Sequence, residues 1–108
     1  MSRPPAFTTR TRERIKVRSG GRCERCSGHG REYAHRRGRG VRDEHTGCTC
    51  NACWLCRTCH RELTLNPDKA LREGFQVSKY QDEPWTVPVQ TVAGWVYLDC
   101  EGGWTPLQ

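Results

Sequence analysis

The stretch NACWLCRTCHRE, residues 51–62, places an asparagine, a Cys-x-x-Cys pair and an adjoining histidine close together. A second pair, Cys23 and Cys26, lies upstream in the sequence CERC. One Cys-x-x-Cys pair supplies half of a tetrahedral zinc site, and two such pairs bring four thiolates to Zn²⁺ at about 2.3 Å each. The spacing therefore predicts a structural zinc ion bound by Cys23, Cys26, Cys56 and Cys59.

The chain is short and hydrophilic, with 108 residues, 34% of them hydrophobic, and a mean hydropathy of −0.87. These values predict one small domain with a thin core that needs cross-links. The eight cysteines provide either disulfides in an exported protein or metal thiolates in a reducing compartment. Because the sequence contains no apolar run of signal-peptide or transmembrane length, we expect a cytoplasmic protein with reduced cysteines and no membrane partner.

Positive charge is concentrated in the N-terminal part of the chain. Residues 1–42 contain thirteen Arg or Lys against three Glu, whereas residues 43–108 contain five against nine Asp or Glu. Twelve of the thirteen cations are arginines, whose planar guanidinium suits phosphate contact. The asymmetry indicates a polyanionic partner, most simply DNA, although a solvated basic surface is the alternative.

Short helices and one hairpin are expected around the cysteine pairs. Thr8 or Thr9 caps a predicted helix over residues 10–18, which Gly20-Gly21 ends, and a second helical pattern covers residues 57–65. Asn66-Pro67 predicts the start of a third helix that ends before Gly74. Valines flanking Pro88 and the stretch WVYL, residues 95–98, predict a C-terminal β-hairpin.

Four further cysteines lack a matching Cys-x-x-Cys spacing: Cys48, Cys50, Cys53 and Cys100. A second metal bound by Cys48, Cys50 and Cys53 is conceivable, but the spacing favours free thiols. His29 and His45 belong to no ligand pattern. We accordingly expect about one zinc ion per chain and little effect from replacing Cys100.

The order of a Cys-x-x-Cys pair, a histidine in a basic segment, an asparagine and Leu-Cys-x-x-Cys-His resembles the HNH (ββα-metal, His-Me finger) endonuclease family. The segments NPDKALREGFQV, EPWTVPV and GWVYLD are similar to small HNH proteins of actinobacterial phages, so the resemblance covers most of residues 20–100. It implies a small α+β fold whose ββα-metal element is stapled by the four-cysteine zinc, with short flanking helices and a C-terminal hairpin. The implied organisation is a basic arm or helix over 1–20, an HNH core over 21–74 and a packing hairpin over 75–108.

The resemblance also assigns catalytic roles. His35 matches the general base, Asn51 the residue that orients it, and His60 a ligand of a catalytic divalent ion such as Mg²⁺, Mn²⁺, Ni²⁺ or Zn²⁺. Imidazole suits proton abstraction near neutral pH, and a cation stabilises the phosphate and the leaving oxygen. Four arginines are expected to contact the DNA phosphates: Arg36, Arg37, Arg39 and Arg42.

Two positions depart from the family pattern. Relatives commonly carry Asp or His where this chain has Ala34, and many carry a histidine where it has Thr64. Glu32, two residues before Ala34 on the expected strand, is the candidate for the missing ligand because side chains alternate with period two. A metal-dependent DNA endonuclease, acting near genome packaging by analogy with the phage proteins, is therefore favoured over a zinc-containing DNA-binding module of the same fold.

Overall fold

Helix α1 (Thr9–Ser19) is the first element of the fold, and the computed structural model describes residues 7–37, 43–78 and 83–107. The Thr8 side chain accepts a hydrogen bond from the backbone N–H of Thr11 at the start of the helix. Gly20, in the left-handed conformation at φ 64°, ends it. The predicted cap, helix and stop are thus confirmed to within a residue or two.

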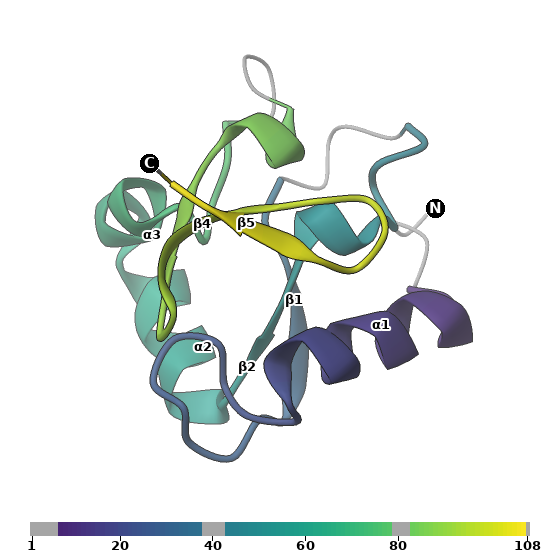
Figure 1. Cartoon of the computed structure of the whole chain (residues 1–108). Coiled ribbons are helices and arrows are strands. Elements are labelled where there is room, and N and C mark those ends of the chain that lie inside the picture. The colour runs from purple at the N-terminus through teal and green to yellow at the C-terminus, as the bar shows by residue number, and fades with distance from the viewer. Residues whose placement is uncertain (1–6, 38–42, 79–82, 108) are drawn as a thin grey trace, which may run out of the picture.

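A short hairpin forms the centre of the molecule (Figure 1). Strand β1 (Glu32–His35) pairs antiparallel with β2 (Ala52–Leu55), with Ala34 opposite Cys53. The 3₁₀ helix η1 (Thr49–Asn51) leads into β2. Helices α2 (Arg57–Leu65) and α3 (Pro67–Glu73) follow directly, at the positions that the sequence predicts.

The C-terminal part is a three-stranded antiparallel sheet rather than the predicted two-stranded hairpin. The 3₁₀ helix η2 (Pro84–Thr86) precedes β3 (Val89–Thr91) and β4 (Gly94–Leu98), and β5 (Trp104–Pro106) pairs with β4. Strand β5 escaped prediction because its three residues are all exposed and therefore show no apolar alternation.

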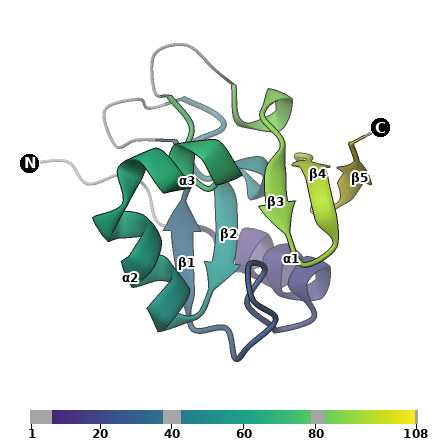
Figure 2. The same ribbon diagram turned by 90° about the vertical axis from the view of Figure 1, so that its left-hand side faces the viewer.

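The two faces of the β1–β2 hairpin pack against different parts of the protein. Ala34, Cys53 and Leu55 join the larger core, which also takes in buried residues of α2, α3, β3 and β4. Ala52 and Trp54 point the other way and pack with Phe7 and Ile15 beside α1. Figure 2 shows the same arrangement, with α2 and α3 on one side of the hairpin and α1 behind it. Period-two alternation along both strands produces this division.

A buried ion pair fastens α1 to the hairpin. The Arg18 guanidinium donates to Glu24 at 2.8 and 2.9 Å and to the carbonyl oxygens of Thr49 and Ala52. Glu24 also accepts the backbone N–H of Trp54 at 2.9 Å. Burial acts to lower the pKa of Arg18, but the charge and hydrogen bond of Glu24, together with Cys53 and Asp99, outweigh it and the pKa is raised. The arginine therefore stays charged and satisfied inside the protein.

A second arginine, Arg36, is only 1% exposed and sits where four chain segments meet. Its guanidinium donates to the backbone carbonyl oxygens of Gly74, Cys50, Pro84 and Val87, at 2.8–2.9 Å. Close approach of the segments is possible because Gly74 has φ 81° and a Cβ atom there would overlap the carbonyl of Pro88. Arg36 is therefore a structural link, and the prediction that it contacts DNA is wrong.

We predict that Arg36→Lys destabilises the fold by about 3 kcal/mol, because one ammonium cannot satisfy four buried carbonyl oxygens in a planar arrangement. Thermal unfolding should show a melting temperature lower by roughly 10–20 °C. Arg72→Lys, at an exposed position of α3, is the matched control and should leave the melting temperature nearly unchanged. Equal melting temperatures for both variants would show that the four contacts contribute little.

Candidate metal centres and active site

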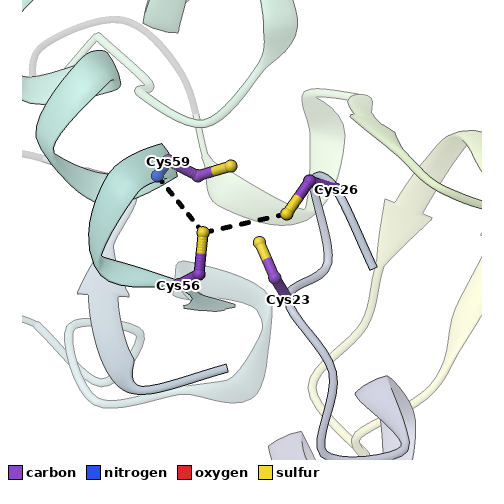
Figure 3. A group of neighbouring side chains, drawn as sticks. All are labelled: Cys23, Cys26, Cys56 and Cys59. Atoms are coloured by element: carbon purple, nitrogen blue, oxygen red, sulfur yellow. Dashed lines mark hydrogen bonds between the residues drawn. The ribbon is translucent and has the colours of Figure 1, made fainter. Parts of the chain in front are cut away.

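Four cysteine sulfurs converge at the start of α2, as the sequence predicts. Cys23 and Cys26 lie on the turn that follows α1, Cys56 is the N-cap of α2, and Cys59 lies in its first turn. All four sulfurs lie within 4.8 Å of one another, and those of Cys26 and Cys56 are 3.7 Å apart. Two sulfurs on one tetrahedral zinc ion are separated by about 3.8 Å. The arrangement, drawn in Figure 3, can therefore hold a metal ion.

The local backbone prepares these sulfurs for a cation. Cys56 Sγ accepts the N–H of Cys59, and Cys26 Sγ accepts the N–H of Gly28, both at 3.3 Å. Burial acts to raise the pKa of Cys23, but hydrogen bonds from backbone N–H groups, that of Cys56 first, lower it to about 7. Metal binding requires the thiolate form of these ligands.

Arg25, between the first two cysteines, connects this turn to both neighbouring helices. Its Nε lies 2.8 Å from Glu73 at the end of α3, and a terminal nitrogen lies 2.5 Å from Glu62 in α2. Its side chain is 15% exposed, so these ion pairs are partly shielded from water. These ion pairs therefore hold the turn against α2 and α3 independently of the cysteine sulfurs.

A second group of possible ligands was not expected from the sequence. His45, Cys48, Cys50 and Cys100 place their ligand atoms within 4.8 Å of one another, so this group can also hold a metal ion. Cys53 belongs to neither group; it packs in the core, where burial raises its pKa to about 12. The Cys48-x-Cys50 spacing was the available sequence signal for this second group. Cys100 lies about 50 residues further along the chain, and no spacing pattern connects it to the other ligands.

The proposed catalytic ligands meet on the α2 side of the hairpin. His60 Nδ1 and Glu32 Oε1 are 2.8 Å apart, and both side chains are a little over one-third exposed. His60 also lines a pocket of about 150 Å³ together with Ala34, His35 and Thr64. Such a volume accommodates an ion with a few water molecules.

This pocket offers few ligands for a cation. Ala34 contributes none, and the Thr64 hydroxyl donates to the backbone oxygen of His60 at 2.8 Å. Among the described residues, His60 and Glu32 are joined by no third His, Cys, Asp or Glu in a compact group. The two donors fit one side of a divalent ion, and water would have to complete its coordination.

Asn51 is fully enclosed and braces the end of β1. Its backbone oxygen accepts the N–H of Arg36, and its side-chain oxygen accepts the N–H of Arg37 at 2.7 Å. Its side-chain nitrogen donates to the carbonyl of Thr46. The backbone that directly follows His35 is thereby fixed to the loop before β2.

His35 lies at the end of β1 with its imidazole stacked on Phe7. The ring centroids are 4.2 Å apart and the planes are inclined by 21°. The stack places the ring on the face of the hairpin that packs beside α1, and its Nε2 is buried, while the residue also lines the pocket near His60. His35 and His60 therefore border one pocket from two elements, the end of β1 and helix α2.

The predicted phosphate contacts need revision. Arg37 is 4% exposed and pairs with Asp43 at 2.6 Å and Glu83 at 3.2 Å, so it is committed inside the protein as Arg36 is. Arg39 and Arg42 lie outside the described residues. Two exposed arginines of α2, Arg57 and Arg61, lie on either side of His60 in the sequence, and Arg57 Nε lies 4.0 Å from Glu32.

Comparison with protein-family models, with curated proteins and with solved structures finds no match to this chain. No helix of the described residues has the length and apolar character needed to cross a membrane.

We predict that removal of metal by a strong chelator unfolds the protein, because a closed four-thiolate site contributes on the order of 10 kcal/mol to folding. Circular dichroism should lose its helical signal as zinc is released, and a chelator already saturated with zinc is the control. Retention of the full signal after complete metal removal would contradict a structural role for the ion.

Proposed function

We propose that the protein is a metal-dependent DNA endonuclease of the HNH class that hydrolyses a phosphodiester bond. The carrying observation is the 2.8 Å contact between His60 Nδ1 and Glu32 Oε1 beside the pocket that Ala34 and His35 line. A carboxylate and an imidazole so close together, on different elements, form a partial site for a divalent ion. The four-cysteine group, in this proposal, holds a structural zinc and fixes the start of α2.

The ion's contribution is electrostatic: a divalent cation at His60 and Glu32 stabilises charge on the phosphate and on the leaving oxygen. Only these two protein donors face it among the described residues, which predicts weak binding and a need for high ion concentration. In this respect the chain departs from the HNH pattern that it resembles, which commonly has Asp or His at the position of Ala34 and often His at that of Thr64.

His35 is the proposed general base. It takes a proton from the attacking water as the new P–O bond forms and the bond to the leaving oxygen breaks. Stacking on Phe7 limits rotation of the imidazole, and Asn51 holds the backbone just after it. Phe7 and Asn51 are therefore positioning residues, which act through His35.

Arg57 and Arg61 are the proposed phosphate contacts, in place of the buried Arg36 and Arg37. They lie one turn apart on the exposed surface of α2, and His60 lies between them in the sequence. A DNA backbone that crosses the start of α2 would meet both guanidinium groups and bring a phosphate to the pocket. The contact would be largely independent of base sequence.

A second candidate, a zinc-containing DNA-binding module with little or no cleavage, is favoured by two observations. Among the described residues only two protein donors are available for the catalytic ion, and the His35 ring is engaged with Phe7. This module would share the DNA partner and the structural zinc. For either candidate, a cytoplasmic location and an association with phage packaging proteins rest on the sequence and on the HNH resemblance alone.

We predict that the protein nicks plasmid DNA in the presence of Mg²⁺, Mn²⁺ or Ni²⁺, and that His35→Ala lowers the rate at least about 100-fold, because the general base is lost. Zinc content and DNA affinity should remain unchanged. His60→Ala should also be slow, but high Mn²⁺ should restore part of its activity, since added cation compensates for a weakened site and not for a missing base. His29→Ala, at an exposed histidine, is the control.

Two variants that add a possible metal ligand can be tested in the same assay. Ala34→Asp places a carboxylate in the pocket and should lower the ion concentration needed for cleavage, whereas the neutral Ala34→Asn should not. Thr64→His, at an exposed position, tests the second missing ligand with less risk to folding. If wild type and both variants are inert with every ion, the binding module replaces the nuclease.

We predict that Arg57→Ala and Arg61→Ala each reduce the slope of log affinity against log salt by roughly one unit, because each removes one phosphate contact. Arg10→Ala, on exposed helix α1, is the matched control and should leave the slope unchanged. A response to Arg10→Ala alone would move the DNA-binding surface to α1.

A further inference from the structure

Four metal-binding side chains meet where the loop before η1 touches the turn after β4. We propose that His45, Cys48, Cys50 and Cys100 bind a second structural zinc ion, separate from the four-cysteine site, that fastens the C-terminal sheet to the loop preceding Asn51. The proposal concerns the architecture of the protein and does not depend on nuclease activity. It also reverses the expectation that replacing Cys100 has little effect.

The spacing of the donor atoms matches a tetrahedral ion. Sulfurs of Cys50 and Cys100 are 3.9 Å apart, and His45 Nδ1 lies 3.6 Å from Cys100 Sγ and 4.0 Å from Cys50 Sγ. With Zn–S of about 2.3 Å and Zn–N of about 2.0–2.1 Å, tetrahedral geometry requires about 3.8 Å between sulfurs and about 3.6 Å between sulfur and nitrogen. A disulfide would instead need sulfurs about 2.05 Å apart.

The histidine is oriented as a ligand should be. Its Nδ1 faces the sulfurs, while its Nε2 lies 3.5 Å from Glu44 Oε1. A carboxylate opposite the coordinating nitrogen favours the tautomer with the proton on Nε2 and leaves the Nδ1 lone pair for the metal. The ring also packs against Trp85, with centroids 4.3 Å apart.

The donor set selects the kind of metal. Three thiolates and one imidazole form a soft, closed set typical of structural zinc, whereas Mg²⁺ and Ca²⁺ require oxygen ligands. Cys50 is fully buried, and the other three residues are partly buried. All four positions of the tetrahedron are supplied by protein, which leaves no vacancy for a substrate and indicates a structural role.

The position of the group explains what it would stabilise. Cys48 precedes η1 and Cys50 lies within it, so the group directly adjoins Asn51. Cys100 follows the end of β4, and beside it the Thr49 hydroxyl donates to the carbonyl of Asp99 at 2.7 Å. Linking Cys50 to Cys100, 50 positions apart, restricts the unfolded chain strongly, which is how such a cross-link stabilises a small domain.

Zinc content per chain tests the proposal in intact protein purified without chelator. Wild type should contain two zinc ions, and Cys100→Ala and His45→Ala should each contain about one. Cys53→Ala removes a buried cysteine outside both groups and should keep two ions, so it is the matched control. A single zinc ion in wild type, unaffected by Cys100→Ala, would overturn the proposal.

Hydrogen exchange provides an independent measurement for a variant that folds poorly. Loss of the second ion should speed exchange in β4, β5 and η1 while α2, beside the four-cysteine site, keeps its protection. Wild type loaded with one and with two equivalents of zinc gives the same comparison without mutation. If β4, β5 and η1 exchange at the same rate with one and with two equivalents of zinc, the second ion does not hold the C-terminal sheet.

Discussion

The structure depends most on one buried guanidinium. Arg36 donates to the carbonyl oxygens of Gly74, Cys50, Pro84 and Val87, and so joins η1, the end of α3, η2 and the approach to β3. Burial lowers its pKa, but backbone dipoles on every side stabilise the charge without a directly bonded carboxylate. A planar group with five donors is suited to this junction, because it reaches buried carbonyl oxygens of four segments at once. Without it, buried carbonyl oxygens of these segments would lose a hydrogen-bond partner.

Other arginines also form their polar contacts inside the protein. Arg18 pairs with buried Glu24 and holds α1, Arg25 connects the first cysteine turn to α2 and α3, and Arg37 pairs with Asp43 and Glu83. A basic segment therefore need not form a basic surface. In a chain with a thin apolar core, ion pairs and carbonyl contacts of arginine provide many of the links between segments. Among the described residues, exposed cations remain on α1 and α2.

The four-cysteine group and the candidate active site are mechanically connected. Cys56 and Cys59 fix the first turn of α2, and His60 is the next residue along that helix. The group thus sets the position from which His60 reaches Glu32 on β1. At the other end of the two strands, Asn51 holds the end of β1. A site assembled from two short elements requires such support from both, because small displacements of either would separate its ligands.

The sequence by itself determined the local features. Caps and stops at Thr8, Gly20 and Gly74 defined the helices, and two Cys-x-x-Cys pairs indicated one metal site, because each of these signals acts over a few residues. Tertiary structure alone decided which arginines are buried, where β5 pairs, and that His45 meets Cys100. These outcomes depend on contacts between residues distant in sequence, whose convergence is set by how the hairpin, helices and C-terminal sheet pack together.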